Sequence, residues 1–149
     1  SIFNLHQFIE DTLDLHMAEA KRYEQNAPVL ALAAAAGSSS LLLDFTVGPV
    51  NILLQKEGKL IFQNTFEIED AQEFHYYLAL LIRELQIDRN IEVLMSGMIH
   101  EHDGYHTCIS SYFDYNTFNL PRANDMDKAI LEDMPAHYYS SLLALDICV

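Results

Sequence analysis

The chain has 149 residues, half of them hydrophobic, which is enough for one domain with a real core and argues against disorder. Its 22 acidic residues outnumber 8 basic ones and give a net charge of −14. This charge repels the phosphate backbone of nucleic acids and anionic membrane surfaces, so both are disfavoured as partners and the acidity is expected to serve solubility.

Cysteine usage and apolar runs predict the compartment. Cys108 and Cys148 both lie in apolar or aromatic surroundings, and two such cysteines predict buried thiols in a reducing cytoplasm instead of a disulfide framework. No basic segment followed by an apolar run opens the chain, and the longest apolar stretch, residues 29–36, is too short to span a bilayer. We therefore expect a cytoplasmic protein without membrane insertion.

The first 25 residues predict an amphipathic helix. Apolar residues recur at helical spacing over residues 3–23, and acidic residues occupy the opposite face. We expect one face of this helix to be buried. Because the chain begins directly inside the helix, we also expect it to be part of a longer protein.

Residues 26–40 are mostly small and predict a linker. Four alanines, Ala33 to Ala36, precede Gly37 and three serines, and the Gly-Ser part is typical of a flexible connection. The alanine run fits either a helical turn or a strand. We expect this segment to connect the N-terminal helix to a domain over residues 41–149.

Three strands in succession are predicted next, over residues 41–47, 50–55 and 59–68. Gly48 and Pro49 form the first turn, and Glu57 with Gly58 closes a hairpin. Apolar and other residues alternate along the third segment, as in a half-buried strand. These features predict an antiparallel meander.

Helices and strands alternate in the remainder of the chain. Asp70, with Glu73 three residues later, has the form of a capping box and predicts a helix that ends near residue 85. Residues 91–99 are almost continuously apolar, as expected for a parallel strand covered on both sides. The last predicted elements are a helix over residues 106–115, a strand over 117–120, a weak helix over 125–134 and a final helix opened by Pro135.

This order predicts an α/β fold of the ribonuclease-H-like class. A three-stranded meander followed by helix–strand crossovers is the building block of actin-like ATPase lobes. Domain 41–149 would then be one such lobe, with parallel strands and covering helices after the meander.

Three segments carry a resemblance to a known family: residues 54–66, residues 138–148, and residues 73–99 with their Phe74-His75-Tyr76-Tyr77 helix and Met95-Ser96-Gly97 strand end. They resemble a bacterial family of proteins of unknown function, found mainly in Bacteroidetes. That family is similar to actin-like ATPases and, more loosely, to the pilus-assembly protein PilM. Its members typically have two related lobes, so the resemblance implies that this chain corresponds to the C-terminal one.

The first candidate site is the turn after the first strand. An actin-like lobe presents an acid and a glycine there, because the backbone must approach phosphate and the acid holds Mg²⁺ through water. The sequence offers Asp44, Thr46 and Gly48, but the spacing is two residues too long and Pro49 removes an N–H donor. An ordinary strand and turn is the favoured interpretation, with ATP and magnesium as possible ligands.

The second candidate is Ser96-Gly97, at the carboxyl end of the apolar strand. Ligands of open α/β sheets bind at such strand ends, and a glycine lets the backbone come close to them. The apolar Met98 and Ile99 follow where a Gly-rich loop would be expected. A bulge in the strand is the favoured interpretation.

The third candidate is the histidine cluster His100, His102 and His106. Three imidazoles next to carboxylates suit zinc or another borderline metal. Such residues are also common in solvated loops, and a surface loop is the favoured interpretation.

Three functions follow from these candidates. The first is a non-catalytic scaffold or regulatory module that acts through a protein partner or a second lobe of the same protein. The second is a nucleotide-binding protein or weak ATPase whose site is shared with a second lobe. The third is a metal-dependent hydrolase that uses the histidine cluster.

Overall fold

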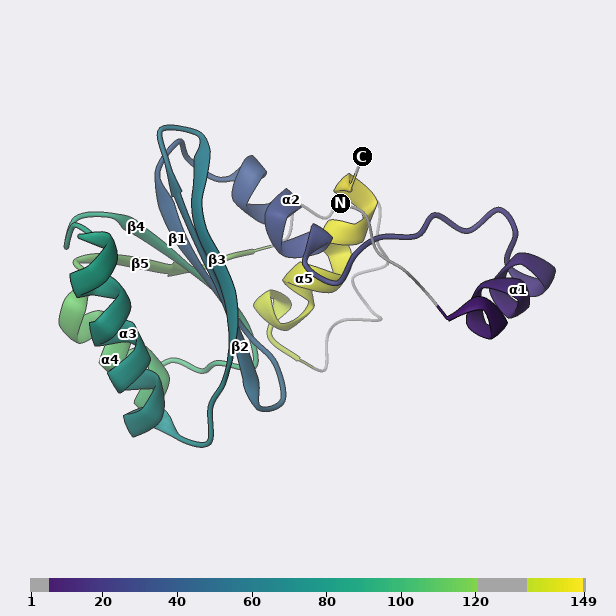
Figure 1. Cartoon of the computed structure of the whole chain (residues 1–149). Coiled ribbons are helices and arrows are strands. Elements are labelled where there is room, and N and C mark those ends of the chain that lie inside the picture. Colours follow the sequence, from purple (N-terminus) through teal and green to yellow (C-terminus); the bar gives the residue numbers. More distant parts are fainter. Residues whose placement is uncertain (1–5, 121–133, 149) are drawn as a thin grey trace.

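The structure is a computed structural model that describes residues 6–120 and 134–148 (Figure 1). The helix predicted over residues 125–134 lies, apart from its last residue, outside the described residues. Within the described ranges the chain forms one five-stranded sheet with helices on both faces.

The sheet has the order β3-β2-β1-β4-β5. Its strands are β1 (Ser40–Phe45), β2 (Pro49–Lys56), β3 (Lys59–Glu67), β4 (Glu92–Gly97) and β5 (Tyr115–Phe118). β2 is antiparallel to β1 and to β3, whereas β4 is parallel to β1 and to β5. The predicted meander and the two parallel strands after it are confirmed. Every residue of β1 is buried, because this strand lies at the centre of the sheet.

One face of the sheet is covered by α3 (Ala71–Leu85) and α4 (Gly104–Tyr112), to the left of the sheet in Figure 1. The start of α3 confirms Asp70 as the N-cap, because its carboxylate accepts the N–H groups of Gln72 and Glu73. The Glu73 carboxylate reaches back as predicted, but to the N–H of Glu69, one residue before the N-cap. The large apolar core lies beneath these two helices, and its fully buried members include Leu41, Leu43, Ile52, Phe74, Leu78 and Met95.

The opposite face is covered by α2 (Ala27–Ala35) and by the C-terminal elements η2 (Ala136–Tyr139), α5 (Ser140–Leu143) and η3 (Ala144–Ile147) (Figure 1). Their core is small and consists of Val29, Leu32, Ala33, Leu42, Leu53 and Ala144. Pro135 precedes the C-terminal segment as predicted, but the segment is divided into three short helical pieces instead of one helix.

The structure corrects the prediction of a linker over residues 26–40. Residues 27–35 form a helix because alanine and leucine have high helix propensity and Pro28 stands in the first turn, where its missing N–H does no harm. This helix is apolar all round, and Val29, Leu32 and Ala33 are buried against the sheet, as expected of such a helix. Only the short connection before β1 remains irregular.

The structure also corrects the predicted burial of the N-terminal helix. α1 (Gln7–His16) is shorter than predicted and buries none of its residues. It stands apart from the sheet, at the right of Figure 1. The hydroxyl of Tyr23, beyond α1, donates to the carbonyl of Cys148 at 2.8 Å, which fixes the following segment to the C-terminal elements. The amphipathic pattern thus predicted the helix correctly, but the predicted burial of its apolar face is wrong for the described residues.

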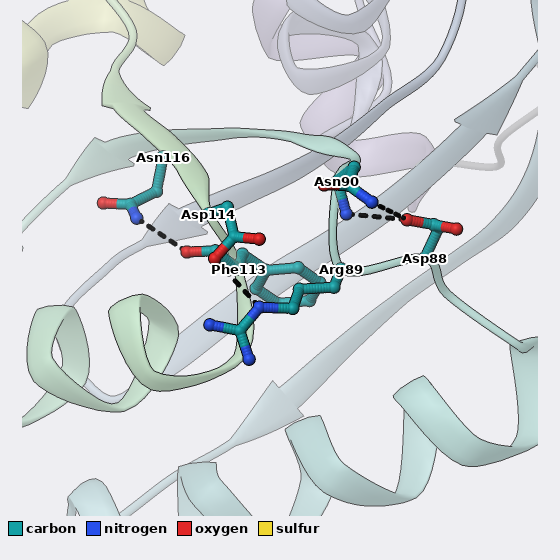
Figure 2. A network of polar contacts seen from close by, with 6 residues as sticks. All are labelled: Asp88, Arg89, Asn90, Phe113, Asp114 and Asn116. Carbon is teal, nitrogen blue, oxygen red and sulfur yellow. Dashed lines mark hydrogen bonds and ion pairs between the residues drawn. The ribbon is translucent and has the colours of Figure 1, made fainter.

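A polar network joins the two loops that precede β4 and β5 (Figure 2). Arg89 donates through Nε to the Asp114 carboxylate at 2.8 Å, and the Asp114 N–H donates to the Arg89 carbonyl. The Asn116 side chain donates to the Phe113 carbonyl at 3.2 Å. The amino ends of the two parallel strands are therefore held together by hydrogen bonds.

A search of the described residues for a membrane-crossing helix, one both long and apolar enough, finds none.

Candidate functional site

A row of polar side chains crosses the sheet near the carboxyl end of β1, and we call Thr65, Asn51, Asp44 and Ser96 the polar row. The register places these residues side by side on β3, β2, β1 and β4. Ser96 Oγ donates to Asp44 Oδ1 at 2.6 Å, and Thr65 Oγ1 donates to Asn51 Oδ1 at 2.6 Å. Asp44 also has a side-chain hydrogen bond with Asn51.

The polar row lies on the same face of the sheet as α2. Side chains alternate along a strand, and Leu42 and Leu53, two positions from Asp44 and Asn51, pack against α2. The polar row therefore interrupts the small core of this face and not the large core beneath α3 and α4.

Burial dominates the chemistry of the Asp44 carboxyl. Only 2% of Asp44 is exposed, and this burial raises its pKa above the ordinary value, while the hydrogen bonds from Ser96 and Asn51 oppose the rise. An acid that holds a hydrated Mg²⁺ ion must be ionised and within reach of the water that the ion carries. The Asp44 carboxyl instead has hydrogen bonds with its strand neighbours Ser96 and Asn51.

The predicted phosphate turn is closed on itself. The N–H and the hydroxyl of Thr46 both donate to the Pro49 carbonyl at 2.9 Å. Gly48 has φ +97°, which explains a glycine there, and its carbonyl accepts the N–H of Ile68 at 3.3 Å. The donors of Thr46 therefore serve the turn itself.

Gly97 is required by the neighbouring strand. Its φ is +77°, and a Cβ at this position would lie 1.9 Å from the Phe45 carbonyl oxygen. The Met98 N–H donates to that same oxygen at 2.8 Å, and the Ile99 N–H donates to the Gly97 carbonyl at 2.9 Å. The His100 N–H donates to the Asp103 carboxylate at 2.8 Å. Three consecutive N–H groups after β4 are thus used within the chain.

Of the three predicted metal ligands, His102 and His106 lie together, with their rings edge to face and ring centroids 5.9 Å apart, whereas the His100 ring has another partner. The His100 ring contacts the Tyr138 hydroxyl, whereas His106 Nδ1 accepts the His102 N–H at 3.2 Å. The His106 ring stacks on Phe118. In the part of the chain that the structure describes, no group of three or more His, Cys, Asp or Glu side chains could hold a metal ion.

The C-terminal segment covers the carboxyl end of β4. His137 is buried, and its Nε2 hydrogen bonds to the Ile99 carbonyl at 2.8 Å. Since a carbonyl only accepts, Nε2 carries the proton. The imidazole stacks on Phe118 with ring centroids 4.3 Å apart. This contact fixes the loop that leaves Gly97.

Only some residues of this site were predicted from the sequence. Asp44 and Ser96 were predicted and lie in contact. Thr46 and Gly48 lie in the turn after β1, and Gly97 is the last residue of β4. Asn51, Thr65 and His137 were missed. Polar residues inside predicted strands were the available signal for Asn51 and Thr65, and nothing local marked His137.

The sequence matches the model of one protein family over residues 1–115, more than half of the chain. The chain belongs to the family "Protein of unknown function (DUF3822)". This agrees with the predicted resemblance to a family of unknown function. A search of curated proteins finds no match.

Three solved structures are similar in fold to this DUF3822 chain. A Bacteroides thetaiotaomicron protein with an actin-like ATPase fold and unknown function is similar with a TM-score of 0.63 at 18% identity, over 88% of this chain and 52% of that one. AlfA, in a filament bound to AMPPNP, gives 0.51 at 15% identity, over 78% and 40%. The ethanolamine utilization protein EutJ from Carboxydothermus hydrogenoformans gives 0.52 at 12% identity, over 83% and 53%.

These similarities confirm the predicted actin-like α/β fold. The chain spans about half the length of the solved structures that it matches. At these identities the likeness concerns the fold, so the function must be argued from the residues of this chain.

Proposed function

We propose that this DUF3822 chain is a non-catalytic actin-like module that works through protein contacts. The observation that carries the proposal is that four N–H groups at the two expected phosphate turns already donate within the chain. The N–H groups of Thr46, Met98 and Ile99 donate to carbonyl groups of the chain, and that of His100 to a side chain. A phosphate would have to displace these bonds, and each exchange would leave a carbonyl or carboxylate oxygen without its donor.

The buried acid supports the same proposal. A carboxyl whose pKa is raised by burial, and which already accepts the Ser96 hydroxyl, is poorly suited to hold a hydrated magnesium ion. We therefore assign Asp44 a structural role within the polar row.

The module would act in the cytoplasm with a protein partner or a second lobe. Both cysteines are free, in keeping with a reducing compartment. The exposed apolar residues of α1, including Phe8 and Leu15, offer contact surface. A second lobe would be in keeping with matched structures that are about twice as long.

Calorimetric titration of the intact protein with AMPPNP and magnesium tests this proposal. We expect no saturable heat at millimolar nucleotide, and the same flat trace for Asp44→Ala. Micromolar binding that Asp44→Ala abolishes would contradict the proposal. Asp88→Ala, at the other end of the sheet, controls for the loss of an acidic side chain.

A shared nucleotide site is the second candidate function. It is favoured by the place of Asp44 and Ser96, which meet at the carboxyl ends of β1 and β4, where open α/β sheets bind ligands. AlfA, similar in fold, is bound to AMPPNP. In this candidate a second lobe would supply the phosphate donors, so the titration separates it from the first when the protein used carries that lobe.

A further inference from the structure

β3 forms one edge of the sheet, and among the described residues no strand pairs with its outer side (Figure 1). It has nine residues, whereas β5 at the other edge has four. Proteins usually protect an edge strand with proline, lysine or a short length. β3 contains no proline, and its one lysine, Lys59, is its first residue. The rest of the strand is therefore open to pairing with another strand.

The backbone of Thr65 shows which groups of β3 face this open side. The Thr65 N–H donates to the Asn64 side chain at 2.9 Å, so it takes no part in the ladder with β2. Residues of an antiparallel ladder alternate between pairs that exchange hydrogen bonds and pairs that do not. Pro49 opposite Glu67 fits the same phase, because proline has no N–H to give. Gln63, Thr65 and Glu67 therefore direct their backbone donors and acceptors outward.

The regular part of β3 is nearly palindromic. Residues 62–66 read Phe-Gln-Asn-Thr-Phe and follow a register shift near the start of the strand. Phe62, Asn64 and Phe66 pair with β2 residues of the large core, so all three lie on the α3 face. Both phenylalanine side chains are only partly buried. In an antiparallel pair with Asn64 opposite Asn64, each Phe62 would lie opposite a Phe66, and aromatic cross-strand pairs stabilise sheets.

The charges at the two ends of β3 favour this antiparallel arrangement. The hairpin end carries Lys56, Lys59 and one acid, Glu57. The opposite end carries Glu67, followed by Glu69. No ion pair joins Lys59 or Glu67 to another described residue. Antiparallel pairing brings the basic end of each copy near the acidic end of the other, whereas parallel pairing would bring like charges together.

We infer that two copies of this chain associate through β3, antiparallel to each other about a two-fold axis at Asn64. Gln63 of each copy then exchanges backbone hydrogen bonds with Thr65 of the other, and the two sheets become continuous. The Asn64 side chain, which is exposed, releases the Thr65 N–H and returns to water. The inference rests on the proposed function, because it names the partner of the protein-contact module.

The net charge of −14 on each copy opposes association, so the charges at the strand ends should have a measurable effect on it. Sedimentation of the intact protein over a broad concentration range should show reversible self-association. Lys59→Glu should weaken it about tenfold, and so should Glu67→Lys, because the two-fold axis repeats each change at both ends of the interface. Both changes in one chain should restore association, since the ends are again complementary.

Two matched variants control for net charge. Lys21→Glu and Glu19→Lys change the charge of the chain by the same amounts, but at exposed residues outside the sheet. They should alter association less than the variants of β3. Circular dichroism should show a folded protein in every case, because all four positions are exposed.

Cysteine cross-linking tests the register. The Cα atoms of an antiparallel pair without hydrogen bonds are about 4.5 Å apart, within the reach of a disulfide. Asn64→Cys should therefore give a disulfide-linked dimer under mild oxidation. Gln63→Cys should not, because the two Gln63 positions are diagonal neighbours about 7–8 Å apart. A mixture of Gln63→Cys and Thr65→Cys should cross-link, and the unchanged chain, with its free Cys108, gives the background.

Hydrogen exchange of the unchanged protein tests the backbone pairing. The N–H groups of Gln63 and Thr65 should exchange more slowly as the protein concentration rises, because they become bonded to the second copy. Those of Phe62 and Asn64 already belong to the ladder with β2 and should change much less. This alternation is specific to strand pairing.

Three results would overturn the inference. The first is a monomer at every concentration up to millimolar, which would leave β3 to a different protein. The second is association that the β3 charge variants change no more than Lys21→Glu and Glu19→Lys do. The third is equal cross-linking of Asn64→Cys and Gln63→Cys.

The nucleotide titration is independent of these results. A chain that binds AMPPNP through Asp44 but still associates through β3 would contradict the proposed function and keep this inference. A monomer that binds no nucleotide would do the reverse.

Discussion

The two faces of the sheet are built in different ways. Beneath α3 and α4 the sheet buries large apolar side chains, among them Leu43 and Phe74, in one continuous core. Beneath α2 and α5 the core is small, and the sheet carries the polar row and a cavity instead. The first face supplies most of the hydrophobic stabilisation, so the second can hold a buried acid and open space without loss of the fold.

The largest difference between the faces should appear when a core side chain is truncated. Phe74→Ala should lower the free energy of unfolding by about 3–5 kcal/mol, because Phe74 is completely buried on all sides. Leu32→Ala, which faces the cavity, should cost about 2 kcal/mol, at the low end of the range for leucine. Urea denaturation measures both. Equal losses would mean that the α2 face is packed as tightly as the other.

Gly97 and Gly58 form a matched pair that tests the close approach of β1 and β4. Both have positive φ, but a Cβ at Gly97 would meet the Phe45 backbone, whereas a Cβ at Gly58 would meet nothing within 4 Å. Gly58→Ala should cost about 1–2 kcal/mol from the left-handed backbone alone. Gly97→Ala should cost about 3 kcal/mol or more, measured in the same urea titration. Similar costs for the two variants would show that the strand ends are not in close contact.

The two ends of the sheet should respond to pH with opposite signs. The pKa of Asp44 is raised in the folded state, so its ionisation destabilises the fold as pH rises above the ordinary value of 3.8. Asp44→Asn should therefore stabilise the protein near neutral pH, and the gain should fade as pH falls toward that value.

Asp88 at the amino end is the control. Hydrogen bonds from Asn90 lower the pKa of this exposed carboxyl, so its contribution is present above pH 3.8 and is lost as pH falls (Figure 2). Asp88→Asn should weaken the fold slightly at neutral pH. Thermal unfolding across pH measures both variants, and a loss of stability for Asp44→Asn at neutral pH would contradict the account of a buried, unfavourable charge.

The smallest effect should come from the exposed ion pair between Arg89 and Asp114. Arg89 and Asp114 side chains are 62% and 45% exposed, so solvent screens them. Arg89→Ala should cost about 0.2–1 kcal/mol, and a double-mutant cycle with Asp114→Ala gives the coupling. A larger coupling would mean that solvent does not screen this ion pair as its exposure implies.

The strands and α3 could be predicted because their signals are local. The Gly48-Pro49 and Glu57-Gly58 turns delimit the meander, and Asp70 with Glu73 marks a helix start. α2 was missed because alanine and leucine on every side leave no amphipathic period to detect. The burial of α1 was predicted wrongly because a period shows that a helix has an apolar face and not which surface covers it.

Residues of the site could be predicted only at positions that the actin-like fold indicates. Asp44 and Ser96 could be proposed as neighbours because the carboxyl ends of parallel strands meet. The roles of Asn51 and Thr65 depend on strand register, and that of His137 on a contact 38 residues away with Ile99. The acceptors of the N–H groups that follow Gly97 likewise depend on the folded backbone. The spacing of residues in the sequence does not reveal them.

A ¹H–¹⁵N NMR titration with AMPPNP and magnesium tests the central claim most directly, because it observes the donor N–H groups one by one. If the phosphate turns are occupied by the chain's own acceptors, the N–H signals of Thr46 and of residues 98–100 should stay in place at millimolar nucleotide. Saturable shifts confined to these residues would show that they bind phosphate and would contradict the account.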